Sequence, residues 1–168
     1  MFKEGFHVKT GLLCLLSVTA VALLIVTLQI IAADAGARSV SPEYRLSIEQ
    51  PRYSGQWKGY DLTVEYSYTK EQGQIDLSGN IRFATYLALG YSRLHDFRLG
   101  AIFLDENGSI VEEIGLATNR GSLDPIPFKR KINLPSNAIS MAFTYQGNAT
   151  SSGGNGAGDT SFSFYPIH

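Results

Sequence analysis

The sequence predicts an all-β protein: a single antiparallel β-sandwich, immunoglobulin-like, with roughly seven or eight strands, preceded by one N-terminal transmembrane helix. Three observations lead to this prediction. Residues 11–33 are apolar and uncharged, the later segments alternate apolar and polar residues, and glycine, proline and asparagine recur between those segments. Alternation with a period of two is typical of half-buried strands, and frequent turn residues are typical of sandwiches and barrels.

Residues 11–33 are long enough to cross a membrane as a helix. The 23 residues carry no charge, and at about 1.5 Å per residue they span about 34 Å, more than a bilayer core. The apolar core of a signal peptide is shorter, about 7–15 residues. The sequence also offers two small-x-small cleavage sites, at 33–35 and 35–37, so cleavage of a signal peptide is the alternative to a retained signal anchor.

The flanks of this segment set the expected topology. Lys3 and Lys9 precede it, and Arg38 and Arg45 follow it, so the positive-inside rule gives nearly equal weight to the two sides. The short N-terminal segment nevertheless resembles a signal anchor, and we expect a single-pass membrane protein whose C-terminal domain is exported, to the bacterial periplasm or the extracellular side. The expected organisation is a cytoplasmic head at 1–10, a transmembrane helix at 11–33, a linker at 34–43 and a β-sandwich domain at 44–168.

One polar side chain near the end of this segment is a candidate for contact with another helix. Gln29 can hydrogen-bond a neighbouring transmembrane helix, a contact worth about 0.6 kcal/mol on average. Its position within two turns of the exported end also permits simple hydration at the interface.

The first strands are predicted from two alternating segments. In 61–68, Leu62, Val64, Tyr66 and Tyr68 share one face. The segment 74–83 repeats the pattern, with a glycine at 79 that suggests a bulge or a close backbone approach. Gly73, in the connection between them, suits the positive φ of a hairpin turn.

The remaining strands are predicted from the same alternation and from one strong turn signal. Asn107-Gly108 between apolar runs predicts a hairpin. Two segments do not fit the pattern: 84–96 could form a crossing strand, a short helix or a buried connection, and 147–159 is a glycine-rich loop. The segments expected to form strands are 97–105, 109–116, 128–134, 138–146 and 160–166.

The composition excludes several classes of function. From residue 38 onward the chain has 12 Lys and Arg (14 less two) and 13 Asp and Glu (15 less two), so it lacks the basic footprint of a nucleic-acid-binding protein. The only cysteine, Cys14, lies in the apolar segment, and the exported part holds only His95 and His168. These residues form no recognisable zinc site or catalytic triad. We therefore expect no cofactor, no metal and no enzymatic activity.

Four exposed-looking residues form the candidate interaction surface. Trp57 and Tyr60 lie in a glycine-rich stretch that reads as a turn, where they could bind a glycan or sit at the membrane interface. Lys129 and Lys131 share one face of an expected strand, where they could contact anionic lipid or an acidic partner, or block pairing at a sheet edge.

Taken together, these features predict a membrane-anchored β-sandwich that acts as a non-catalytic accessory or scaffolding subunit of a membrane or envelope protein complex. Its expected partners are membrane lipid, through 11–33, and other membrane or envelope proteins. The alternative is an exported glycan- or peptide-binding module, whose N-terminal segment could be a cleaved signal peptide. An undetected hydrolase would require a pocket in which His95 meets a carboxylate.

Overall fold

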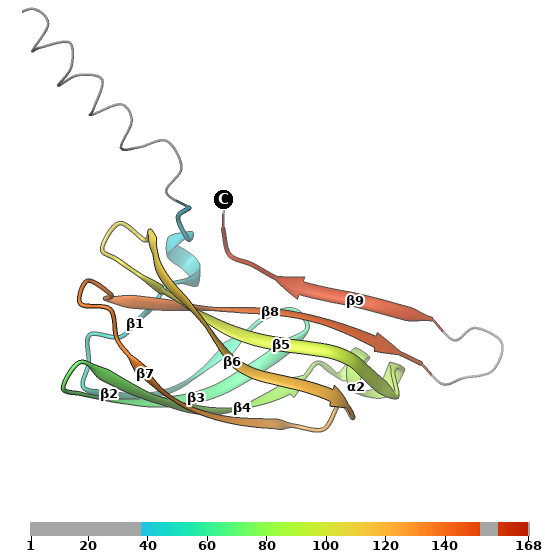
Figure 1. Ribbon diagram of the computed structural model, residues 1–168. Helices are drawn as coiled ribbons and strands as arrows, with labels where there is room; N and C mark the ends of the chain where they lie inside the picture. Colours follow the sequence, from blue (N-terminus) through green and yellow to red (C-terminus); the bar gives the residue numbers. More distant parts are fainter. Residues whose placement is uncertain (1–37, 152–157, 168) are drawn as a thin grey trace, which may run out of the picture. The chain divides into compact units, whose positions relative to one another are not determined.

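The computed structural model describes residues 38–151 and 158–167 (Figure 1). The chain divides into two compact units, and all described residues belong to the second, Arg38–His168. The expected head, transmembrane helix and Gln29 lie outside the described residues, as does the centre of the glycine-rich loop. Among the helices that the structure does describe, none is both long enough and apolar enough to cross a bilayer.

The described residues are mostly strands, with two short helices. The elements in chain order are the 3-10 helix η1 (Pro42–Tyr44), β1 (Leu46–Ser47), β2 (Arg52–Lys58), β3 (Leu62–Glu71), β4 (Gln74–Phe83), α2 (Thr85–Gly90), β5 (Arg93–Leu104), β6 (Ile110–Gly121), β7 (Ile126–Asn133), β8 (Ser140–Thr150) and β9 (Asp159–Phe164).

The strands form two antiparallel sheets that pack face to face (Figure 1). One sheet has the order β2-β3-β4-β7, and the other has the order β1-β8-β5-β6, with β9 also paired to β8. The prediction of an all-β fold with a sandwich-like architecture is confirmed. In the described part of the chain, β1 to β9 make nine strands, against the seven or eight that the pattern predicted.

The alternating residues of the two sheets meet in one core. The four predicted inward residues of β3 are all buried, and Val64 lies between Trp57 on β2 and Ile81 on β4. The opposite sheet contributes fully buried aromatic rings from β5 and β8, including Phe97 and Phe143. Since each such residue removes a large apolar area from water, this core supplies most of the driving force for folding.

The two predicted hairpins are present with the expected turn chemistry. Gln72 and Gly73 both have positive φ, at 49° and 76°, in the β3–β4 turn. In the β5–β6 turn Gly108 has φ 80°, and Asp105 Oδ1 accepts hydrogen bonds from the backbone N–H of Asn107 and of Ser109. Positive φ costs glycine little, which explains the glycines at positions 73 and 108 of these turns.

Gly79 marks a close approach between neighbouring strands. It pairs with Tyr66 on β3 and Phe128 on β7 without a register shift. A Cβ at this position would lie 2.7 Å from the Phe128 ring and in collision with the carbonyl oxygen of Glu65. The glycine therefore makes room for the Phe128 ring to cover the strand, as one of the two predicted alternatives requires.

The segment 84–96 contains the short helix α2 and the beginning of β5. Leu87 is the buried residue of α2, and it anchors the helix on the core. β5 begins at Arg93, earlier than the alternation predicted, and its pairing with β8 is irregular between Leu94 and Asp96. The segment thus turns the chain from one sheet to the other across one end of the sandwich.

The chain enters the described domain at the end opposite to α2 (Figure 1). Val40 is buried, although the sequence assigned it to the linker, and its backbone N–H donates to the carbonyl of Gly108 in the β5–β6 turn. α2 lies at the other end of β5, whose 12 residues span about 40 Å at about 3.3 Å per residue.

Candidate functional site

Trp57 is a core residue, and the expectation that it lies in a surface turn is wrong. It is in β2 and only 8% exposed. Its ring packs 5.6 Å from the Phe143 ring and 5.4 Å from the Phe164 ring, centre to centre. A side chain held between the two sheets in this way has no free face on which a ligand could stack.

Tyr60, by contrast, is 86% exposed. It lies in the β2–β3 connection, and its ring packs 5.9 Å from that of Tyr86 on α2. Leu89, also on α2, is 83% exposed. Leu89 lies three residues after Tyr86 on α2, so the two side chains share one face of the helix. We refer to Tyr60, Tyr86 and Leu89 as the tip patch, at the α2 end of the sandwich.

A buried carboxylate holds the tip patch in place. Asp61 is 6% exposed and accepts hydrogen bonds from two tyrosine hydroxyls, that of Tyr145 at 2.6 Å and that of Tyr86. The carbonyl of Asp61 also accepts from the backbone N–H of Ala84, at the start of α2. This Asp61 cluster (Asp61, Tyr86 and Tyr145) joins the β2–β3 connection, α2 and β8.

The surroundings of the Asp61 cluster raise the pKa values of its two tyrosines. Burial raises the pKa of both Tyr86 and Tyr145 well above its usual range, and the hydrogen bond to Asp61 raises it further. Each phenol therefore stays protonated and remains a hydrogen-bond donor to the carboxylate over the whole physiological range. The cluster is a fixed structural support for α2.

A second group of buried tyrosines predicts a loss of stability at high pH. Burial, with smaller contributions from Tyr53 and Tyr68, raises the pKa of Tyr66 to about 12 from an ordinary value of 10.0. The folded state therefore holds this proton more tightly than the unfolded state. The resulting stability is fully present below about pH 10 and is lost as the pH rises through about 12.

We expect the urea midpoint to fall over this interval, and phenolate absorbance to show tyrosines that ionise only with unfolding. Tyr66→Phe removes the titrating group, so its urea midpoint is expected to fall less steeply over the same pH range. An equally steep fall in this variant would contradict the assignment to Tyr66.

Lys129 and Lys131 lie on the outer face of β7, which is an edge strand, as the sequence indicated. They pair with Ser78 and Asp76 of β4. Between them, Arg130 points to the opposite face, and its Nε donates to the carbonyl of Gly115 on β6 at 3.2 Å. The lysines therefore protect an exposed edge from pairing with another chain, and they are also available to an acidic partner.

His95 lies on the surface in a chain of three polar side chains. Its Nε2 is 2.5 Å from Thr150 Oγ1, and this hydroxyl donates to Asp159 Oδ1 at 2.6 Å. With the threonine hydroxyl donating to Asp159, the contact with His95 is completed by the tautomer in which Nε2–H donates to this hydroxyl. Among the described residues, no group of three or more acidic, histidine or cysteine side chains could hold a metal ion.

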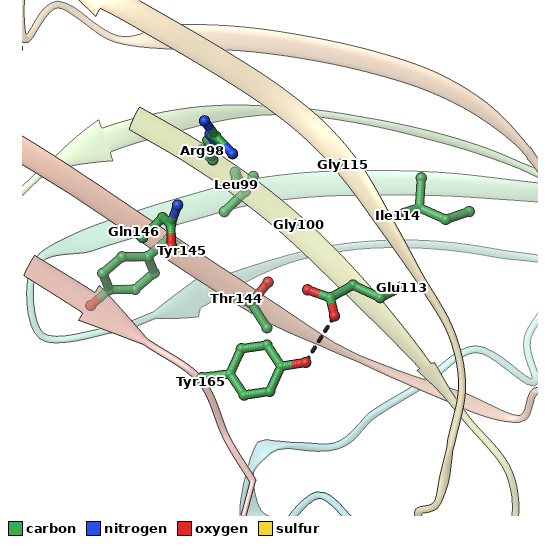
Figure 2. Close-up of a pocket in the computed structure, with 10 residues that line it drawn as sticks. All are labelled: Arg98, Leu99, Gly100, Glu113, Ile114, Gly115, Thr144, Tyr145, Gln146 and Tyr165. Carbon is green, nitrogen blue, oxygen red and sulfur yellow. Dashed lines mark hydrogen bonds between the residues drawn. The ribbon is translucent and has the colours of Figure 1, made fainter. Parts of the chain in front are cut away.

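The structure also shows a site that sequence reasoning missed. A hollow of about 270 Å³ opens on the outer face of the β6-β5-β8 sheet. Figure 2 shows Arg98, Gln146, Thr144, Glu113 and Tyr165 arranged around Gly100. These residues come from four separate parts of the chain, 98–100, 113–115, 144–146 and 165. No local motif could have linked these parts before the strand pairing was known.

The chain matches no protein-family model, no curated protein and no solved structure. The surfaces described above are therefore the basis on which we assign a function.

Proposed function

We propose that the protein is a single-pass membrane-anchored β-sandwich that serves as a non-catalytic accessory or scaffolding subunit of a membrane or envelope complex. The observation that carries the proposal is the tip patch. Two of its side chains, Tyr60 and Leu89, are more than four-fifths exposed, at 86% and 83%. Contiguous exposed apolar side chains of this size typically mark a surface that another protein covers.

The tip patch has the properties of a docking surface. Tyrosine carries a large apolar ring and a polar hydroxyl, and it is enriched among the residues that dominate interface energetics. The Asp61 cluster fixes Tyr86, and Tyr86 packs on Tyr60. A partner therefore meets side chains that are already held in place, which lowers the conformational entropy lost on binding.

The tip patch is remote from the point where the chain enters the described domain. The chain enters the domain beside the β5–β6 turn, and the tip patch lies at the opposite end of the sandwich. A partner that covers the tip patch would therefore not contact Val40 or the β5–β6 turn.

We propose that the domain is immunoglobulin-like in its architecture only, and not in the order of its strands. Constant-type immunoglobulin domains place their third strand in the sheet opposite to the first two. Here β2, β3 and β4 are neighbours in one sheet. The proposed likeness is therefore limited to two packed sheets with binding loops at one end.

The alternative function is that of an exported glycan- or peptide-binding module. The sequence placed its binding surface at Trp57 and Tyr60, and the structure gives this surface little support. An aromatic platform there would require both Trp57 and Tyr60, and Trp57 is in the core. Such a module would therefore need a binding surface elsewhere on the sandwich.

Photo-crosslinking in native membranes tests the proposal. We expect a photoreactive benzoylphenylalanine at Tyr60 and at Leu89 to give adducts of one recurrent mass, identified by mass spectrometry. The matched control is the same residue at Ser54, which is exposed on the outer face of β2. Equal labelling from Ser54, or adducts only from Lys129, would place the partner elsewhere and refute the role of the tip patch.

A further inference from the structure

The hollow on the β6-β5-β8 sheet has a floor without side chains. Gly100 of β5 pairs with Gly115 of β6 on one side and with Thr144 of β8 on the other. A Cβ at Gly115 would meet no atom within 4 Å, so the space above it is open. Two glycines side by side in a sheet bring the backbone within reach of a flat ligand, because no Cβ stands between them.

Two oxygen atoms lie close together over this floor. A Cβ at Gly100 would lie 2.7 Å from Thr144 Oγ1 and 3.9 Å from Glu113 Oε1. Both oxygens therefore overhang the same glycine. A side chain at this position would displace the Thr144 hydroxyl, so the glycine keeps these two hydrogen-bonding groups next to the open space.

The Thr144 hydroxyl has no hydrogen-bond partner in the described part of the chain, although the residue is only 5% exposed. The side-chain amide of Gln146, on the same face of β8, is also without one among these residues. Among the described residues, Ser41 Oγ is the only fully buried side-chain oxygen or nitrogen without a hydrogen-bond partner. The Thr144 hydroxyl is therefore reached by solvent from the hollow that it lines, and a ligand can replace the water that hydrates it.

Tyr165 forms one wall of the hollow. It follows β9, and its hydroxyl donates to Glu113 Oε2 at 2.8 Å, as Figure 2 shows. This hydrogen bond occupies one oxygen of the carboxylate and leaves Oε1 directed over Gly100. The half-exposed ring offers an apolar face beside polar groups.

The side chains that line the hollow carry one positive and one negative charge. Arg98 and Glu113 are its two charged residues, one of each sign. Each of them already has a partner: the Arg98 guanidinium lies 3.3 Å from a carboxylate oxygen of Asp96, and Glu113 Oε2 accepts a hydrogen bond from the Tyr165 hydroxyl. A net charge on the ligand is therefore not favoured. The lining instead offers both donors and acceptors to an uncharged molecule that has both.

We propose that this hollow binds a single neutral sugar residue in its pyranose form. Sugar hydroxyls both donate and accept hydrogen bonds, which matches Glu113 Oε1, Thr144 and the Gln146 amide. The apolar face of a pyranose suits the Tyr165 ring. The volume of about 270 Å³ lies just below the range of about 300–1,000 Å³ for small-molecule sites, so one ring fits better than a chain.

Binding is tested on the full-length protein in phospholipid nanodiscs, since glycoside detergents would compete. The probes are the methyl glycosides of glucose, galactose, mannose and N-acetylglucosamine, observed by saturation-transfer NMR at up to about 10 mM, above the Kd of a weak site. Glucuronate, phosphate and glycine report on anionic and zwitterionic ligands. We expect saturation transfer to at least one neutral glycoside. Transfer to none of them, or only to the charged probes, would overturn the proposal.

Two substitutions locate the site. Gly115→Val fills the open space above the floor, and Thr144→Val removes the hydroxyl that lacks a partner while keeping the shape of the side chain. Each is expected to weaken glycoside binding by about tenfold or more. Thr144→Val is further expected to leave the melting temperature unchanged or raised, because no intramolecular hydrogen bond is lost.

Thr69→Val is the matched control, since Thr69 is exposed on the outer face of the opposite sheet. Its glycoside binding is expected to equal that of the unmodified protein. Should Gly115→Val reduce the melting temperature, Thr144→Val decides the question alone. Full binding by a folded Thr144→Val protein would refute the assignment to this hollow.

Discussion

Replacing Asp61 with alanine is expected to lower the free energy of unfolding by about 2–4 kcal/mol. The substitution removes the acceptor of two tyrosine hydroxyls, and that of Tyr145 is in a buried environment. A buried donor that loses its partner costs about 1–3 kcal/mol. The loss is expected to be greater than the net value of the two hydrogen bonds, since desolvation of the Tyr145 hydroxyl remains.

Urea denaturation of Asp61→Ala measures this loss, and Asp76→Ala is its matched control. Asp76 is exposed on the outer face of β4, so its removal is expected to change stability by no more than about 0.5 kcal/mol. A double-mutant cycle with Tyr86→Phe isolates the contact to α2, for which we expect a coupling of about 1 kcal/mol. Equal stabilities of the two alanine variants would refute the structural role of the Asp61 cluster.

The Asp61 cluster illustrates what the sequence could not provide. Its members are 25 and 84 residues apart along the chain, and no pattern of nearby residues relates them. The sequence showed Asp61 only as the first polar residue of an alternating segment. Its burial results from the meeting of α2 with β8, which is a property of the tertiary structure.

The strands were predicted best where each inward position carries a large apolar side chain. In β3, Leu62, Val64, Tyr66 and Tyr68 alternate without interruption, and all four are buried. The β5–β6 hairpin was equally clear because Asn107-Gly108 requires a turn. In both cases local sequence preference and burial favour the same structure, which is the condition for reliable prediction.

The strand β2 was missed because a glycine occupies the middle of its inward face. Tyr53, Gly55 and Trp57 alternate toward the core, opposite Tyr68, Tyr66 and Val64. The Tyr53 ring covers Gly55, whose Cβ would lie 2.6 Å from the ring. One side chain thus fills the space of two positions, and the sequence reads as a glycine-rich turn.

The short helix and the polar hollow were beyond prediction for different reasons. α2 has only six residues, too few to show a helical period. The hollow depends on which residues of β5, β6 and β8 become neighbours across the sheet. Gly100, Gly115 and Thr144 acquire their common role only through that register.

Replacing Trp57 with alanine is expected to lower the free energy of unfolding by about 3–5 kcal/mol. The indole is the largest side chain between the two sheets at this point, and it contacts the rings of Phe143, Tyr145 and Phe164. Its truncation leaves a cavity that rigid strands cannot close. The expected cost is therefore that of a large core residue, and it is measured by urea denaturation.

Tyr60→Ala is the matched comparison for Trp57→Ala, because it is expected to impair binding of the partner without lowering the stability of the fold. Tyr60 is three residues further along the chain but 86% exposed, so its loss is expected to change stability by no more than about 0.5 kcal/mol. The same variant is expected to lose the partner adduct formed by a photoreactive residue at Leu89. A stable Trp57→Ala protein would mean that the indole is not in the core. A Tyr60→Ala protein that retains the Leu89 adduct would mean that the exposed ring contributes nothing to docking, and that α2 alone meets the partner.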